Sequence, residues 1–385
     1  MKHIRFYHPV PLLLLALLSL TLGGLPFLTY AANRLVAGEP IMLWQLTHGP
    51  GLLLPLALLW LLVWRPPRPA TFLLLLLLAE LLLAGMVFLS GHHAAALAAE
   101  GSRLARTAFG SGLWLSAALC LLLAAEAIRH LTPHPLWRLL LNAQVWLLPL
   151  LMLLSGQLDQ LSLLKEYASR QQVFDQAFAR HLALLVGTLL TALLIGMPLG
   201  IWLCRRPGWQ SATFGVLNVI QTVPSVALFG LLIAPLAGLV QRFPALGDWG
   251  IGGIGAAPAL IALVLYALLP LVRSVVAGLQ QVPAGGRETA RGMGMGPLQQ
   301  FWHAEGPLAL PGWLAGLRVV VVQTLGMTVI AALIGAGGFG AIIFQGLLSS
   351  ALDLVLLGVI PVIALAVVLD ALFRLVISLL EVTNR

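Results

Sequence analysis

The run TFLLLLLLAELLLAGMVFL, from Thr71 to Leu89, contains a single charged residue, Glu80. A helix of about 20 apolar residues is long enough to cross the hydrocarbon core of a bilayer, which is roughly 30 Å thick. Backbone groups in lipid must bond to one another, so only helices and closed β-barrels span the bilayer. The run lacks the alternation of polar and apolar residues that barrel strands show. It therefore predicts a transmembrane helix.

Similar runs occur along the whole chain. Of its 385 residues, 60% are hydrophobic and 9% are charged, and the mean hydropathy is +1.00. A soluble domain carries about 25% charged residues. We predict an all-α polytopic membrane protein with about ten transmembrane helices. The expected spans are residues 10–30, 47–64, 69–90, 112–130, 138–156, 181–204, 212–240, 256–279, 313–334 and 353–380.

The distribution of positive charge predicts the orientation of these spans. With the N-terminus inside, the expected cytoplasmic segments hold fourteen Lys and Arg residues and the outer segments hold seven, which accounts for all 21. Cytoplasmic loops are enriched in these residues, so we expect both termini and residues 280–310 in the cytoplasm. The net charge of +8 is then explained by contacts with anionic lipid headgroups, and we expect no nucleic-acid partner. The first run begins after Lys2 and Arg5 and is expected to be retained, with a signal peptide as the alternative.

The chain divides into three regions. Residues 1–156 form an N-terminal membrane extension of five spans, and residues 181–380 form a second unit of five spans. Residues 157–180 are a polar bridge on the expected outer side, and part of this bridge has the helical spacing of an amphipathic segment in the headgroup plane. We detect no repeat between the halves, which disfavours the inverted repeats of secondary transporters.

Two glycine-rich segments match a nucleotide-binding pattern in the wrong context. Segments 250–255 and 335–340 fit the dinucleotide fingerprint, which requires a preceding strand and a following helix. Both lie between expected membrane helices, so we predict tight turns and close helix approach. A P-loop needs a lysine after its last glycine, and the chain has only Lys2 and Lys165. We expect no cofactor on this chain, and ATP hydrolysis only on a separate subunit.

The residue types used in metal and catalytic sites are sparse. The histidine pairs 92–93 and 130/134 lack a third ligand, and Pro133 and Pro135 interrupt the helix that would align the second pair. Cys120 and Cys204 lie in or at the end of different spans, so we expect no disulfide. We expect neither a metal site nor a catalytic centre, and the chain is predicted not to be an enzyme.

Charged residues inside spans are the other indication of function, because each costs about 2.5–3.5 kcal/mol at mid-bilayer on insertion scales. Glu80 lies near the centre of its span and either pairs with a polar group across the bundle or takes part in transport. Asp370 and Arg374 are four residues apart and are expected to pair on one helix face, and Glu126 lies near a span end. A proton relay needs a chain of such groups, and the sequence does not supply one.

The longest polar stretch of the second unit, residues 280–310, contains RETARGMGMG from Arg287 to Gly296. A short helix presenting Glu288 and Arg291 can enter a groove on a soluble partner. The glycines at 292, 294 and 296 permit a turn and close backbone approach, and Met293 and Met295 offer adaptable apolar contacts. Pro307 and Pro311 are expected to stop helices and stiffen the return to the membrane. The stretch therefore predicts a docking element.

The second unit resembles the membrane subunits of bacterial binding-protein-dependent ABC importers. The loop signature of that family is Glu-Ala-Ala, three residues, Gly, nine residues, Ile, one residue and Leu-Pro. Glu288, Ala290, Gly294 and Pro307 fall on this spacing, whereas Thr289, Ala304 and Gly306 depart from it. The osmoprotectant branch (glycine betaine, choline, proline betaine) is resembled by the segments QTVPSVALFG, YALLPLVR, ARGMGMG, PLALP, AGLR and IGAGGFG. The resemblance covers about residues 180–380, and the first five spans look like the extension of a subset of these permeases.

This resemblance implies a permease subunit of an ATP-driven importer in the bacterial inner membrane. The implied partners are cytoplasmic ABC ATPases, a second permease subunit that is identical or homologous, an extracytoplasmic solute-binding protein and the lipid bilayer. The implied ATPase-docking residues are Arg287, Glu288, Ala290, Arg291, Gly292, Gly294 and Pro307. The alternatives are a permease for an amino acid such as methionine and an ATP-independent channel or secondary transporter that depends on Glu80 or Asp370.

Overall fold

The computed structural model describes residues 8–33, 36, 38–100, 104–248 and 250–383, and the chain forms two compact units, Met1–Ser169 and Arg170–Arg385. Within the described residues, eight helices are long and apolar enough to cross a membrane. The first two expected spans correspond to the shorter apolar helices Pro9–Gly24 and Pro50–Val63. The helical membrane architecture is thus confirmed. The division between the units lies inside the expected bridge 157–180.

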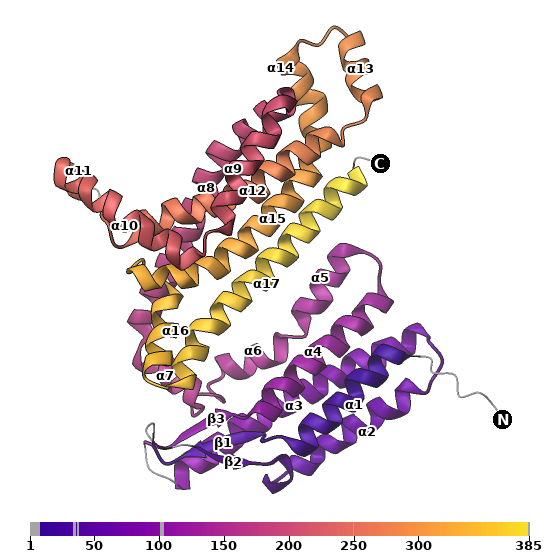
Figure 1. Cartoon of the computed structure of the whole chain (residues 1–385). Helices are drawn as coiled ribbons and strands as arrows, with labels where there is room; N and C mark the ends of the chain where they lie inside the picture. The colour runs from indigo at the N-terminus through magenta and orange to yellow at the C-terminus, as the bar shows by residue number, and fades with distance from the viewer. Residues whose placement is uncertain (1–7, 34–35, 37, 101–103, 249, 384–385) are drawn as a thin grey trace. The chain divides into compact units, whose positions relative to one another are not determined.

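Unit 1 is a bundle of apolar helices with a small sheet at one end (Figure 1). Its elements are α1 (Pro9–Gly24), β1 (Leu28–Ala31), β2 (Glu39–Ile41), η1 (Leu43–Gln45), η2 (Gly49–Leu52), α2 (Leu53–Val63), α3 (Pro69–Glu100), β3 (Arg106–Phe109), α4 (Ser111–Leu131), α5 (Pro135–Gln144), α6 (Leu147–Leu154) and α7 (Ser162–Ser169).

The sheet of unit 1 was not anticipated from the sequence. Its three antiparallel strands are ordered β2-β1-β3, with Leu28 opposite Ile41 on one side and Phe109 on the other. The expected first span (10–30) therefore ends at Gly24, and its last residues enter a strand. Strands of three or four residues are too short for the alternation by which strands are recognised.

Leucine side chains hold the helices of unit 1 together. Leu15 and Leu18 of α1, Leu59 of α2 and Leu75 of α3 are fully or almost fully buried in one apolar cluster with α4. Hydroxyl groups inside this bundle form hydrogen bonds with each other. Thr21 Oγ1, for example, lies 2.8 Å from Ser116 Oγ. Buried polar groups need such partners.

The expected fifth span, 138–156, is divided into α5 and α6. The Trp146 amide donates to the Ala143 carbonyl at 3.2 Å, which closes a turn between the two helices. Pro149 lies in the first turn of α6, where its missing amide does no harm. No residue of either helix is buried within the chain, so this span exposes apolar side chains on most of its surface.

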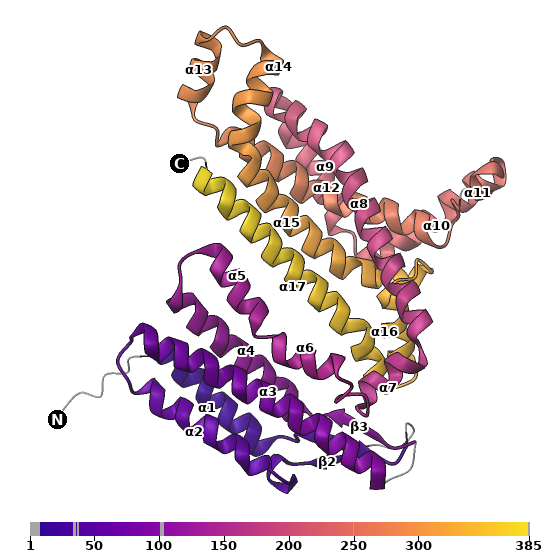
Figure 2. The same ribbon diagram turned by 180° about the vertical axis from the view of Figure 1, so that it is seen from behind.

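Unit 2 contains longer helices and a projecting helical hairpin (Figures 1 and 2). Its elements are α8 (Gln171–Arg205), η3 (Pro207–Trp209), α9 (Gln210–Thr222), α10 (Ser225–Arg242), α11 (Ala245–Asp248), α12 (Ala256–Gln280), α13 (Ala284–Gly292), α14 (Pro297–Gln300), the π-helical turn η4 (Phe301–Glu305), α15 (Gly306–Ile330), η5 (Ala331–Ile334), α16 (Phe339–Leu348) and α17 (Leu352–Thr383).

The expected span 212–240 is wrong as one helix. It consists of α9 and α10, separated at Val223 and Pro224. A residue before proline is driven out of the helical region, and Val223 is accordingly extended (ψ 127°). The expected span 181–204 begins earlier than predicted, because α8 starts at Gln171 and takes up the second half of the expected bridge.

The central helix of unit 2 is α12, which packs against α8, α9, α10 and α15. Its contacts with α8 are close because Gly200 has no side chain: a Cβ there would lie 2.7 Å from Val275 Cβ. Gly316 of α15 has the same role beside Ser274, where an added Cβ would lie 2.0 Å from Ser274 Cβ. These helices therefore hold the base of the hairpin firmly.

The two glycine-rich segments form turns at one end of unit 2, as predicted. Gly255 has φ +108°, and Gly335 has φ +79°. Only glycine adopts such angles without strain. The Gly255 amide donates to the Ile334 carbonyl at 2.8 Å, so the two segments meet directly. Arg180 of α8 joins them by donating from Nε to the Ala336 carbonyl at 3.0 Å.

Candidate functional site: the helical hairpin between α12 and α15

The segment expected to dock a partner is a helical hairpin made of α13, α14 and η4. Figures 1 and 2 show it at one end of unit 2, beyond the ends of α12 and α15. The predicted short helix is confirmed, since α13 covers Ala284–Gly292 and follows Pro283. Proline is well placed before a helix because its φ is already fixed near the helical value.

Gly294 ends α13 and turns the chain towards α14. Its φ is +76°, its amide donates to the Arg291 carbonyl at 2.9 Å, and the Met295 amide donates to the Ala290 carbonyl at 3.2 Å. This pair of bonds is the Schellman arrangement, in which glycine takes the left-handed position after the helix. The space around a Cβ at Gly294 is open. Its requirement for glycine is therefore one of backbone conformation rather than packing.

Arg287 fastens the hairpin to its base. Its Nη2 donates to the Leu279 carbonyl at the end of α12, and its Nε lies 3.2 Å from Glu305 Oε1. Gln300 Nε2 donates to the same carboxylate oxygen at 3.1 Å. One side chain thus joins α12, α13 and η4. Arg287 and Glu305 are both only partly exposed, so solvent screens their attraction less than that of a surface pair.

An apolar cluster supports the hairpin from below. Phe301 stacks near Trp313, with ring centroids 6.2 Å apart, and Trp313 Nε1 donates to the Val275 carbonyl at 3.1 Å. Gly278 makes room for Trp313, because a Cβ there would lie 2.7 Å from the indole. A tryptophan with its N–H satisfied and its ring buried is a rigid support.

The residues predicted for docking fall into two groups. Glu288, Arg291 and Gly292 are exposed, as a contact surface requires, and Gly294 is exposed at the turn between helices. Arg287 faces inward, and Ala290 is 2% exposed. Arg287 and Ala290 thus contribute to the internal contacts of the hairpin.

The prediction that Pro307 and Pro311 stop helices is wrong. Both lie inside α15, which begins at Gly306 and continues the helical stretch from α14 through η4. Pro307 is in the first turn of α15, where the missing amide is tolerated. The preceding π-helical turn gives a looser geometry, in which the Gly306 amide bonds to the Phe301 carbonyl. Turns of this kind are frequent at functional sites.

Three residues of the hairpin were missed by the sequence reasoning. Glu305 pairs with Arg287, Gln300 donates to Glu305, and Trp302 is exposed on the π-helical turn. A carboxylate eighteen positions after an arginine has no recognisable helical spacing, because helix neighbours are three or four apart. An aromatic residue in the polar stretch was the available signal for Trp302.

The charged residues inside spans have partners. Gln144 Nε2 donates to Glu80 Oε2 at 2.7 Å, so Glu80 pairs with a polar group across the bundle, the first of its two predicted roles. The predicted pair of Asp370 with Arg374 is confirmed at 2.8 Å. Arg318 of α15 also bonds to Asp370, a partner that sequence reasoning missed. The Glu80–Gln144 and Arg318–Asp370 contacts join different helices, whereas the Asp370–Arg374 pair lies within α17.

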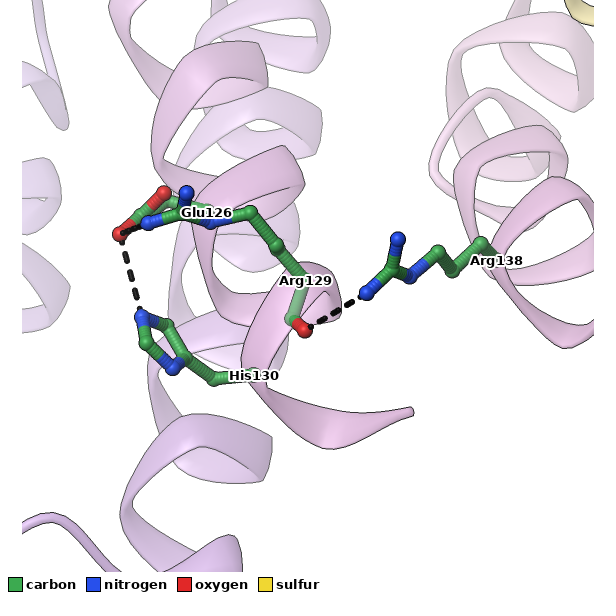
Figure 3. Close-up of polar contacts among 4 residues, drawn as sticks. All are labelled: Glu126, Arg129, His130 and Arg138. Atoms are coloured by element: carbon green, nitrogen blue, oxygen red, sulfur yellow. Dashed lines mark hydrogen bonds and ion pairs between the residues drawn. The ribbon is translucent and has the colours of Figure 1, made fainter. Parts of the chain in front are cut away.

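The remaining candidates lie at the connection between α4 and α5. Figure 3 shows Glu126 beside Arg129 and His130, with Oε1 at 2.8 Å from Arg129 Nη2 and at 3.2 Å from His130 Nε2. Arg138 of α5 donates to the carbonyls of Arg129 (3.3 Å) and Thr132 (2.8 Å). His130 thus contacts the Glu126 carboxylate, and its ring stacks on that of Phe72 with the ring centroids 4.5 Å apart.

Comparison with known proteins places both units. The model of the "Binding-protein-dependent transport system inner membrane component" family matches residues 192–381. That of "ABC transporter permease YehY, N-terminal domain" matches residues 8–164. Unit 1 is therefore a recurring domain of such permeases, in agreement with the predicted extension.

Several curated proteins are similar to about half of this chain. The osmoprotectant import permease protein OsmW of Salmonella typhimurium is 38% identical over 50% of this chain and 84% of its own. The carnitine transport permease protein OpuCB of Listeria monocytogenes is 36% identical (50% and 80%). The glycine betaine/carnitine/choline permease protein OpuCD of Bacillus subtilis is 35% identical (51% and 79%). The solved structure "Inward facing conformations of the MetNI methionine ABC transporter" aligns with 55% of this chain and 98% of its own, at 21% identity and a TM-score of 0.48.

The spans, the signature residues on the hairpin, the family models and the curated relatives agree. The chain belongs to the binding-protein-dependent transport system inner membrane component family, as a permease of ABC importers.

Proposed function

We propose that this chain is the membrane-spanning subunit of an ATP-driven importer for osmoprotectants such as glycine betaine and related quaternary-ammonium or zwitterionic solutes. The observation that carries this proposal is the hairpin, where residues of the family signature sit on a rigid exposed element. Its relatives of known cargo import osmoprotectants, carnitine, choline and betaines. These solutes share a quaternary or otherwise permanently charged ammonium group, and none of the three relatives is described as an amino-acid permease.

In this proposal the hairpin carries force between the chain and a separate ATPase. An ATPase subunit binds the exposed surface of α13 and η4, and its closure on ATP moves the hairpin relative to the bundle. A second permease subunit, identical or homologous, completes the pathway. Each nucleotide state of the ATPase favours either the outward or the inward opening of this pathway. An extracytoplasmic binding protein supplies the selectivity, through aromatic rings that attract the ammonium group.

The proposed orientation puts both termini and the hairpin in the cytoplasm of a bacterial inner membrane. Within unit 2, the hairpin, the α8–α9 connection and the end of α17 lie at the same end (Figure 1). That end carries Arg205, Arg206, Arg287 and Arg291. Positive charge of this density is typical of the cytoplasmic face.

Two measurements test the proposal. Uptake of radiolabelled glycine betaine is followed in a strain lacking other importers, with choline, carnitine and methionine as competitors. We expect saturable uptake that requires a co-expressed ABC ATPase and is blocked by a betaine or choline but not by methionine. Uptake of methionine instead, or betaine uptake by the isolated chain in liposomes without ATPase, would favour the alternatives.

The second measurement addresses the sidedness of the hairpin. Cys120→Ala and Cys204→Ala remove both cysteines of the chain, and Met293→Cys then places a single thiol on the exposed hairpin. A membrane-impermeant maleimide should label this thiol only after the inner membrane is opened and the reagent reaches the cytoplasmic side. Labelling in intact cells with a permeabilised outer membrane would exclude a cytoplasmic ATPase at this site.

A further inference from the structure

The hairpin exposes three large apolar side chains. Met293 is 64% exposed, Leu298 is 71% exposed and Trp302 is 66% exposed. Leu298 and Trp302 are four positions apart on the continuous helical stretch of α14 and η4, so they lie on the same side of it. Gln300 lies on the opposite side of this stretch, and Phe301 lies between Gln300 and Trp302; both Gln300 and Phe301 are buried. We call these three exposed side chains the apolar patch: Met293 at the end of α13, and Leu298 and Trp302 on the helical stretch that follows.

The apolar patch lies outside the membrane. The helical stretch from Pro297 to Ile334 is 38 residues long. A hydrocarbon core of roughly 30 Å takes about 20 residues, and counted from the glycine turn after Ile334 it ends near residue 314. Trp302 is roughly 12 residues further, or about 18 Å along the helix at 1.5 Å per residue. The headgroup layer adds only about 5–8 Å on each side, so lipid does not cover Trp302 even when the helix is tilted.

The surroundings of the apolar patch resemble those of a protein interface. Trp302 packs edge-on against Phe301, with ring centroids 5.3 Å apart, which fixes the indole in place. On the other helix of the hairpin, α13, the charged residues Glu288 and Arg291 are exposed. Interfaces combine a polar rim with a centre enriched in tryptophan and methionine, and the residues that contribute most to binding are most often Trp, Tyr and Arg.

We propose that the apolar patch is the main binding anchor of the hairpin, and that Trp302 enters a pocket of the ATPase subunit. The inference rests on the proposed function and adds which side chains hold the partner. Glu288 and the glycines of the family signature shape the hairpin and border the contact. Trp302, six positions beyond Gly296, supplies most of the buried apolar area.

The test measures binding of the ATPase subunit to the full-length chain in nanodiscs. The ATPase is the P-loop protein that purifies with the wild-type chain and then binds it again when added separately. Trp302→Ala should weaken this binding roughly 30-fold, and Leu298→Ala roughly fivefold, as expected for a central anchor and its neighbour. Trp302→Phe should retain most of the affinity, because it keeps an aromatic ring.

Trp209 provides a matched control. It is 60% exposed in η3, at the same end of unit 2 but directly after α8 leaves the membrane, where tryptophan contacts headgroups. Trp209→Ala should leave the affinity for the ATPase unchanged, and all variants should melt at the temperature of the wild type.

Two results would overturn the inference while leaving the proposed function in place. One is wild-type affinity for Trp302→Ala, and the other is an equal loss for Trp209→Ala, which would mean that both residues act through lipid. If Trp302→Ala melts early, Trp302→Phe and Leu298→Ala decide the question, since neither removes the ring contact with Phe301. Failure of any ATPase to bind the wild-type chain would instead overturn the proposed function itself.

Discussion

Units 1 and 2 each use an arginine to close the end of a long helix, but the two closures support different structures. Arg138 bonds to carbonyl groups of Arg129 and Thr132 at the end of α4 (Figure 3), and Arg287 bonds to that of Leu279 at the end of α12. The last carbonyls of a helix have no partner within it. Both arginines satisfy such groups and place a positive charge where the helix dipole favours it.

The connection after the arginine-bound helix is short in unit 1 and long in unit 2. Three residues, Thr132–His134, join α4 to α5, whereas residues 281–305 separate α12 from α15. Arg287 has a second partner, Glu305, and through it holds a projecting element in a fixed position. The comparison teaches that the same kind of contact stabilises a short turn in one unit and, in the other, a projecting element that we propose binds the ATPase. Substitutions should therefore affect stability in unit 1 and coupling in unit 2.

The largest effect is expected for Arg287→Ala. The change removes the ion pair with Glu305 and leaves the Leu279 carbonyl without this donor, so the hairpin loses its fixed position. Hydrogen bonds to charged groups contribute about 1.5–3 kcal/mol, which predicts at least a roughly tenfold loss of coupled uptake. Glu305→Gln, which keeps a hydrogen-bond acceptor, should lose less. Normal ATPase stimulation by the Arg287→Ala variant would show that the contacts of Arg287 with Leu279 and Glu305 are dispensable.

A smaller loss is expected for Gly294→Ala. A side chain in the left-handed region costs about 1–2 kcal/mol, so we expect roughly fivefold weaker ATPase stimulation. Gly285→Ala is the control, because Gly285 lies in α13 of the same hairpin with open space around its Cβ and no positive φ. Gly294→Asn should recover part of the activity, since asparagine tolerates this conformation. Equal effects at both glycines would argue against a conformational role for Gly294.

For the corresponding arginine of unit 1, we expect a change in stability alone. Arg138→Ala exposes carbonyl groups at the end of α4 and costs about 1 kcal/mol, a lowering of the melting temperature by roughly 2–4 °C. Uptake at 25 °C and stimulation of the ATPase by the variant should both stay within about twofold of wild type. A tenfold loss of uptake without a stability change would show that unit 1 takes part in coupling.

The smallest effect is expected for Glu80→Gln. The amide oxygen can accept the bond from Gln144 Nε2 as the carboxylate does at 2.7 Å. Between pH 6 and 8, uptake should therefore stay within about twofold of wild type, and the melting temperature within about 1 °C. Glu80→Leu, which cannot accept that bond, should melt earlier. Loss of uptake in Glu80→Gln with unchanged stability would reveal a role for the ionised carboxylate.

The helices were predictable because apolar runs of sufficient length have few alternatives in a bilayer. The hairpin was also predictable in kind, since glycine, charge and proline in one polar stretch favour a structured turn. Sequence reasoning failed where a contact depends on the three-dimensional path. The pairing of Arg287 with Glu305 and that of Arg318 with Asp370 join residues that have no periodic relationship.

Two local misjudgements have physical causes visible in the sequence. Val223-Pro224 breaks a run whose hydropathy alone suggested one helix, and the conformational restriction before proline outweighed the apolar pattern. Pro307 and Pro311 were expected to end helices, but Pro307 lies in the first turn of α15, where it costs no bond, and α15 continues past Pro311. Position within the helix therefore matters more than the presence of proline.

The continuity of α14, η4 and α15 has a mechanical consequence. Together with η5, these elements form one helical rod of 38 residues, Pro297–Ile334, which ends at the meeting point of the two glycine turns. Such a rod is roughly 57 Å long at 1.5 Å per residue. Pivoting it by about 5° at one end displaces the other by roughly 5 Å, close to one helical turn. In the proposed mechanism, a small rotation at the hairpin would therefore act as on a lever arm and shift the far end of the bundle by enough to exchange one set of side-chain contacts for another.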